Sequence, residues 1–175
     1  IPLYSQWFGG AEQWHRAQKV PLLDYAQLRR SPMVAAYISN CGGTSHRMDL
    51  LRKLQEHGGT VTQYGSCEHT VGAPAGRSHS KSETMPLHMF HFSAENSLSD
   101  YYLTEKFYEP FQFGVIPVVL SHQASAEEMA PPHSMIHALN FTSAAKLAEH
   151  IKSVYEDREL WSSYFDWKRE PLPDA

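Results

Sequence analysis

Cysteine is scarce in this sequence: only Cys41 and Cys67 occur among its 175 residues. Two thiols cannot complete a four-ligand metal centre, and these two do not form a C-x-x-C pair. They are compatible with one disulfide in an oxidising compartment or with two reduced thiols. The eleven histidines are scattered and show no H-x-x-x-H spacing on a helix face, so we expect no metal site.

Positive charge is also in short supply. The chain has 15 Lys and Arg against 19 Asp and Glu, a net charge of −4 with histidine neutral, so it lacks the basic excess that nucleic acid or an anionic membrane attracts. No apolar run approaches the roughly 20 residues that cross a bilayer. The opening stretch IPLYSQWFGG has no initiator Met and resembles the interior of a protein, so we expect a piece of a longer chain.

What is present is enough apolar material, 42% of the residues, for one well-formed core. Strands are expected at 33–39, 60–64, 87–93, 115–121 and 134–139, and helices at 11–18, 46–57, 103–113 and 143–170. This alternation predicts an α/β fold, a Rossmann-like parallel sheet with helices on both faces. We expect residues 1–32 to be an entry segment or linker and residues 33–175 to be the domain.

Turn and capping residues mark the ends of these elements. Thr44 or Ser45 is expected to cap the second helix, and Thr104 the third. Pro117 cannot donate a ladder hydrogen bond, which predicts a position near a sheet edge or a bulge. The stretch 65–86 is rich in Gly, Ser, His and Pro and is expected to be an exposed loop.

Two loops that lead from strands into helices carry groups suited to a charged ligand. The first, SNCGGTSHR at 39–47, has glycines for a close backbone approach and ends in Arg47, whose guanidinium suits phosphate oxygens. It matches neither G-x-G-x-x-G nor a P-loop, so an ordinary turn with a solvated Arg is the alternative. In a parallel sheet such loops lie at the carboxyl edge, where ligands bind.

The second loop, AENSLSDYYLTEK at 94–106, places polar groups between two apolar segments. Lys106 at a helix start opposes the helix dipole, which an anion bound there would explain. Glu105 is suited to accept hydrogen bonds from sugar hydroxyls, and a hydrated surface turn is the alternative. Together, Arg47 and Lys106 at two crossings of one sheet predict a diphosphate site that also stabilises a leaving group.

The segment that begins with this second loop, AENSLSDYYLTEKFYEPFQFGVIPVVL, resembles the signature segment of the α1,3-fucosyltransferases, F-E-N-S, D-Y-x-T-E-K and V-P-V-V. YISNCGGTSHR, YGSC, IPLYSQW, LNFTSAAKLAEHI and YFDWKRE resemble further segments of that family in the same order. The resemblance implies the C-terminal, donor-binding domain of a GT-B type glycosyltransferase. It implies transfer of fucose from GDP-fucose to a glycan or glycoprotein acceptor with inversion and without an obligatory metal or other cofactor.

Carried over residue by residue, the resemblance implies five donor contacts. Arg47 and Lys106 would contact the diphosphate, and Glu105 would bind ribose or fucose hydroxyls. Asn96 and Tyr102 would line the donor pocket.

Four features depart from the family pattern: Ala94 replaces an aromatic residue, the acidic residue at Asp100-Tyr101 is shifted by one, Ser121 replaces a Gly, and the 65–86 loop differs. No catalytic residue is assigned in this chain, because the family's general base lies in an N-terminal acceptor domain that this sequence does not contain. Glu127, Glu128 and His122 are bases only in principle, and we expect surface roles for them. A non-catalytic structural or interaction subunit is the alternative function.

The resemblance further implies a Golgi-lumen enzyme whose parent is a type II membrane protein anchored by an N-terminal segment. That oxidising setting suits a disulfide involving Cys41 or Cys67. It also suits N-glycosylation at Asn140 in the sequon NFT.

Overall fold

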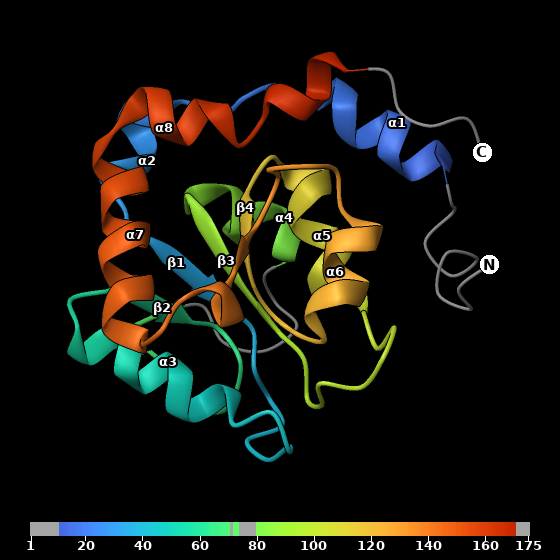
Figure 1. Ribbon diagram of the computed structural model, residues 1–175. Coiled ribbons are helices and arrows are strands. Elements are labelled where there is room, and N and C mark those ends of the chain that lie inside the picture. Colours follow the sequence, from blue (N-terminus) through green and yellow to red (C-terminus); the bar gives the residue numbers. More distant parts are fainter. Residues whose placement is uncertain (1–10, 71, 74–79, 171–175) are drawn as a thin grey trace.

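The centre of the computed structural model, which describes residues 11–70, 72–73 and 80–170, is a five-stranded parallel sheet (Figure 1). Its strands are β1 (Val34–Ala36), β2 (Val61–Gln63), β3 (Phe90–Ala94), β4 (Ile116–Leu120) and β5 (Ile136–His137). They lie in the order β2-β1-β3-β4-β5, and every pairing is parallel. The chain first crosses outward to β2 and then returns past β1, so the winding reverses between β1 and β3. Ligands of open α/β sheets bind at such a reversal.

Helices cover both faces of this sheet, which confirms the expected architecture. One face carries α2 (Tyr25–Leu28), α3 (Arg47–Glu56), α7 (Ala144–Glu156) and α8 (Arg158–Ser163), and the other carries α1 (Ala11–Lys19), α4 (Lys81–Thr84), α5 (Glu105–Phe113) and α6 (Gln123–Met129) (Figure 1). Because strand side chains alternate between faces, Phe92 packs in one core with Leu51 and Ile151, whereas Val119 packs in the other with Phe107.

Several expected elements differ in extent. Beyond β1 the main chain leaves the ladder, and the N–H of Ile38 donates to the Gln63 side chain instead. The last expected strand shortens to β5 and continues as the 3-10 helix η3 (Ala138–Asn140). The expected loop over 65–86, of which residues 71 and 74–79 lie outside the described residues, is wrong at its end, where the chain forms α4 and the 3-10 helix η2 (Met85–Leu87). Thr84 and Met85 are buried there.

The expected cap of α3 by Thr44 or Ser45 is wrong. His46 occupies the cap position with a left-handed backbone, φ 55°, and offers no side-chain cap. Ser45 is unavailable because its hydroxyl donates to the main-chain oxygen of Glu95. Thr104 does occupy the cap position of α5, although its hydroxyl also turns to Glu95 rather than to the helix.

Pro117 lies in an inner strand, so the expectation of an edge or bulge is wrong. The preceding Ile116 directs its N–H toward β3, where it donates to Met89. Because N–H directions alternate along a strand, the nitrogen of Pro117 faces the β5 side. Pairing with β5 begins only at Val118, so the missing donor costs no ladder hydrogen bond.

The entry helix α1 is packed between α5 and the C-terminal 3-10 helix η4 (Asp166–Arg169). Trp14 makes edge contacts with Phe111 and Trp167 at ring-centroid distances of 5.0 and 6.1 Å. Lys168 donates to the main-chain oxygen of Val20 at 2.7 Å. Residues 1–10 of the expected entry segment lie outside the described residues, and the division at residue 33 stays a prediction. No described helix has the length and apolar character of a membrane span.

Candidate functional site

The loops that follow β1 and β3 meet at the carboxyl edge of the sheet, at the point where the winding reverses. Ser45 donates its N–H to the main-chain oxygen of Asn96 at 3.1 Å. Gly43 adopts φ 127°, and a Cβ added to it would lie 2.7 Å from that same Asn96 oxygen. Only glycine permits this approach, so Gly43 brings the first loop against the second loop.

A disulfide fixes the first loop from its other side. Cys41 and Cys67 are joined, with their Cα atoms 5.4 Å apart. The bridge connects the β1–α3 loop to the segment after β2. It thereby restrains the residues that lead to Arg47.

Glu95, the first residue after β3, lies at the centre of the site and is 1% exposed. Its carboxylate accepts hydrogen bonds from the N–H of Thr104 at 2.7 Å and from its hydroxyl at 2.8 Å. Lys106 Nζ lies 3.7 Å from the other carboxylate oxygen. Burial raises the pKa of Glu95, and the Thr104 N–H and the Lys106 charge oppose that rise. A carboxylate at this helix start also complements the dipole of α5.

Lys106 and Glu105 occupy the first turn of α5. The Lys106 ammonium donates to Thr104 Oγ1 and to Glu105 Oε1, each at 2.9 Å, and its side chain is 20% exposed. Burial pushes the pKa of Glu105 upward, but the hydrogen bond and charge of Lys106 outweigh it and lower that pKa. The sequence alone attributed a cation at this helix start to a bound anion, whereas the structure supplies the partner carboxylates from Glu95 and Glu105.

Arg47 points inward and is 3% exposed. Its Nη1 donates to the main-chain oxygen of Ala94 at 3.1 Å and its Nη2 to that of Asn40 at 2.6 Å. Burial lowers its pKa, and the negative charge of Glu95 and the Tyr102 phenol oppose this. The guanidinium therefore links the end of β3 to the first loop, with two of its donors already engaged.

Arg47 and Lys106 nonetheless both lie at the end of β3: Arg47 donates to the main-chain oxygen of Ala94, and Lys106 Nζ is 3.7 Å from the carboxylate of the next residue, Glu95. With Glu105 included, the cluster consists of two cations, Arg47 and Lys106, and two carboxylates, those of Glu95 and Glu105. The cluster is close to neutral, so its attraction for an anion depends on exact placement rather than on excess charge.

Asn96 and Tyr102 lie beside this cluster, and both are partly buried. The Oδ1 atom of Asn96 is buried and has no hydrogen-bond partner among the described residues, and the same holds for Nε of Arg47. Buried polar atoms in folded proteins nearly always find a partner. One buried acceptor and one buried donor at this edge of the sheet are thus without a partner in the part of the chain that the structure describes.

Sequence reasoning did not include Glu95 among the site residues, although its signal was present: a carboxylate directly after a strand whose five residues are all buried. The bases considered in principle lie farther along the edge. Glu127 and Glu128 are exposed on α6, and the ring of His122 contacts Ser125 and Asp100. Among the described residues no three His, Cys, Asp or Glu side chains are grouped to hold a metal ion.

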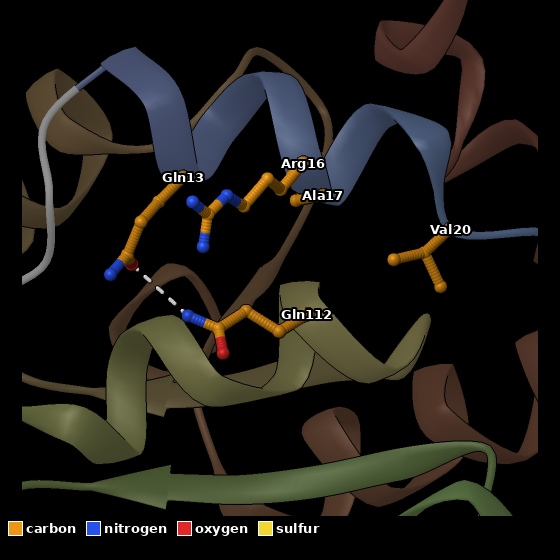
Figure 2. Close-up of a pocket in the computed structure, with 5 residues that line it drawn as sticks. All are labelled: Gln13, Arg16, Ala17, Val20 and Gln112. Atoms are coloured by element: carbon orange, nitrogen blue, oxygen red, sulfur yellow. Dashed lines mark hydrogen bonds between the residues drawn. The ribbon is translucent and has the colours of Figure 1, made fainter.

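A separate pocket of about 270 Å³ lies between α1 and α5 and is lined by Gln13, Arg16, Ala17, Val20 and Gln112 (Figure 2). Gln112 spans it with a hydrogen bond to Gln13 at 3.0 Å. This pocket is near the last turn of α5, whereas Glu105 and Lys106 are in the first turn. It is therefore not part of the cluster around Glu95.

Comparison with known proteins identifies the family. The model of the C-terminal domain of glycosyltransferase family 10 (fucosyltransferase) matches residues 27–173. α-(1,3)-Fucosyltransferase C of Drosophila melanogaster is 35% identical over 139 residues, which are 79% of this chain and 32% of that protein. GDP-fucose protein O-fucosyltransferase 3 of Canis lupus familiaris is 28% identical over 96% of this chain and 37% of its own length.

A solved structure of an α1,3-fucosyltransferase with GDP-fucose has the same fold, with a TM-score of 0.71 and 19% identity over 83% of this chain and 41% of that one. The chain thus spans about a third of the length of the curated relatives it matches. Because the family model matches more than half of the chain, the protein belongs to glycosyltransferase family 10, the fucosyltransferases, and corresponds to the C-terminal part of its members.

Proposed function

We propose that this chain is the donor-binding domain of a fucosyltransferase that transfers fucose from GDP-fucose to a glycan or glycoprotein acceptor with inversion. One observation carries the proposal: two crossover loops converge on Glu95 at the β1/β3 reversal, where the buried atoms Asn96 Oδ1 and Arg47 Nε have no hydrogen-bond partner among the described residues. The family supports the donor, since relatives are named for GDP-fucose or for fucose transfer. The donor domain extends over residues 33–175.

The chemistry of the donor explains why these groups are needed. As the glycosidic bond to fucose breaks, negative charge develops on the departing diphosphate. Lys106, Arg47 and the N-terminus of α5 are fixed donors near one another, and preorganised donors stabilise developing charge without reorganising. Asn96, Tyr102 and Glu105 would hold the nucleoside and sugar hydroxyls, and no step requires a metal held by this chain.

The proton from the acceptor hydroxyl needs a general base that this chain does not supply. We assign that base to an acceptor domain N-terminal to this sequence. Two carboxylates of this chain that could act as a base in principle have other partners at an exposed surface. Glu128 accepts a hydrogen bond from Tyr101, and Glu127 accepts one from Gln123.

We also propose that the protein acts in the Golgi lumen, anchored by an N-terminal membrane segment of its parent. The Cys41–Cys67 disulfide supports an oxidising compartment. Asn140 is exposed in η3 and begins the sequon NFT. A glycan at Asn140 is expected in protein from secreting cells, detected as a mass loss on enzymatic deglycosylation that Asn140→Gln abolishes. Unmodified Asn140 in such protein would contradict glycosylation at this site.

Thermal unfolding of the purified full-length protein with GDP tests the donor assignment. At a GDP concentration about 100 times the Kd, we expect a rise in Tm of about 5 to 10 °C. Lys106→Ala should remove the rise, whereas Lys146→Ala, an exposed charge on α7, should retain it. UDP and ADP should give smaller shifts. A larger shift with either would indicate a different sugar nucleotide.

A non-catalytic interaction subunit is the second candidate. The observation that favours it is the engagement of Arg47 by the main-chain oxygens of Ala94 and Asn40, which leaves few free donors. A protein whose Tm does not respond to GDP would support this candidate and overturn the first.

A further inference from the structure

The tip of the loop between β3 and α5 is tied to the start of α6 by a chain of hydrogen bonds that the proposed donor contacts do not include. The N–H of Tyr101 donates to Ser125 Oγ at 2.9 Å. Ser125 Oγ lies 2.8 Å from His122 Nδ1. On the other side of the imidazole, Nε2 lies 3.3 Å from a carboxylate oxygen of Asp100.

The directions of these hydrogen bonds follow from the groups at the two ends. A main-chain N–H can only donate, so Ser125 Oγ accepts from Tyr101, and a carboxylate can only accept, so a neutral His122 carries its proton on Nε2, facing Asp100. Nδ1 then accepts from the Ser125 hydroxyl. One neutral tautomer of His122 therefore satisfies the whole chain of contacts.

The segment held in this way is strained. Tyr101 adopts φ 54°, the left-handed region, which is unfavourable for a residue with a bulky side chain. Its neighbour Tyr102 is one of the proposed donor contacts. Strain of this kind persists only where the surroundings over-determine it. Here Ser125 and His122 restrain the main chain of Tyr101, and Glu128 accepts a hydrogen bond from its exposed phenol at 2.6 Å.

Burial differs between the two ends of the chain of contacts. Ser125 is 2% exposed, whereas the Asp100 side chain is 78% exposed. A partly buried hydrogen bond contributes more than a hydrated ion pair, which water and salt screen. The Ser125 contact should therefore dominate.

We infer that Ser125 and His122 are positioning residues for the donor-binding loop: they hold Tyr101 in its strained conformation and so fix Tyr102 at the site. This inference rests on the proposed function. Neither residue is among the proposed donor contacts. They act through the main chain of the loop, and their loss should weaken GDP binding without unfolding the domain.

Calorimetric titration of the full-length protein with GDP tests the inference. Ser125→Ala should raise the Kd for GDP about five- to tenfold, the effect of one lost hydrogen bond. His122→Gln should do the same, since its amide reaches only the Nε2 position. His122→Asn places an acceptor at the Nδ1 position and should remain within about twofold of the parent. Glu127→Gln, an exposed change on the same helix, is the matched control.

Amide hydrogen exchange separates this inference from the donor assignment. In the absence of GDP, the Tyr101 N–H of Ser125→Ala should exchange faster than that of the parent protein. The Tm of the variant should stay close to that of the parent. A parent protein that does not bind GDP overturns the donor assignment, and exchange still decides whether Ser125 holds the loop. If the parent binds GDP and Ser125→Ala binds it equally well, the inference is wrong. Equal losses of GDP affinity in His122→Asn and His122→Gln also contradict it, because both variants remove the imidazole and only the Asn variant keeps an acceptor at the Nδ1 position.

Discussion

The Glu95 carboxylate accepts two hydrogen bonds from Thr104, one from its N–H at 2.7 Å and one from its hydroxyl at 2.8 Å. These contacts close the loop between β3 and α5 at its base. They also place a negative charge at the start of α5, where the helix dipole favours it. The polar loop is thus ordered by a buried group of the adjoining strand.

Glu95→Gln tests this role of the carboxylate. The amide oxygen can still accept from Thr104, but the charge that faces Lys106 and the helix start is lost. We expect the free energy of unfolding to fall by about 1 to 2 kcal/mol, measured by urea denaturation. Glu149→Gln, an exposed carboxylate on α7, is the control and should leave the midpoint unchanged. A Glu95→Gln protein as stable as the parent would contradict a structural role for the charge.

Gly43→Ala tests the contact between the two loops. The new Cβ would meet the Asn96 oxygen at 2.7 Å in addition to the strain of φ 127°, so we expect a loss of about 2 kcal/mol. Gly58→Ala provides the comparison, since φ is 89° there and nothing lies within 4 Å. It should cost about 1 kcal/mol, from backbone strain alone. Equal losses in the two variants would show that the loop contact adds nothing.

Reduction of the Cys41–Cys67 bridge should destabilise the protein. The two cysteines are 26 residues apart in sequence, and a crosslink of this span reduces the conformational entropy of the unfolded chain. We expect the urea unfolding free energy to fall by about 2 to 4 kcal/mol in reductant. A Cys41→Ser/Cys67→Ser double variant should have the same unfolding free energy as the reduced protein, and reductant should not change it. A reductant effect on that variant would mean that another process is being measured.

The architecture could be predicted because it depends on local periodicity. Apolar strands alternate with helices, and right-handed crossovers then place helices on both faces of a parallel sheet. Helix α6 was missed because its sequence, QASAEEM, offers few apolar side chains, and Ala126 is the fully buried one. A short helix with one small core contact leaves almost no periodic signal.

The sequence predicts which loops hold the candidate residues, but not the contacts that those residues make. Lys106 at a helix start does need an anion, but the sequence does not say that Glu95, eleven positions earlier, folds back to it. Arg47 was placed at the right loop, yet its guanidinium turns inward to the oxygens of Ala94 and Asn40. Side-chain direction depends on tertiary contacts that no spacing pattern encodes.

Lys168 provides a test at alkaline pH. Its ammonium is partly buried against the Val20 oxygen at 2.7 Å, and burial lowers its pKa from 10.5 to about 8. Between pH 8 and 10 the unfolded chain therefore binds more protons at this position than the folded one, so the stability contributed by this group rises with pH. Burial raises the pKa values of Tyr108 and Tyr164 to about 12, and these and other raised tyrosines act in the opposite direction as the pH approaches and passes 10, so the comparison with Lys168→Met isolates the lysine.

We expect Lys168 to add about 1 to 2 kcal/mol to the urea unfolding free energy between pH 8 and pH 10, after allowance for solvent screening. Lys168→Met keeps the apolar stem but cannot titrate, so its profile over this range should be flatter by that amount. Lys146→Met, at an exposed position, should follow the parent. Parallel plots of unfolding free energy against pH for the parent and Lys168→Met would mean that the ammonium stays hydrated. The hydrogen bond from Lys168 to the Val20 oxygen would then contribute little to stability.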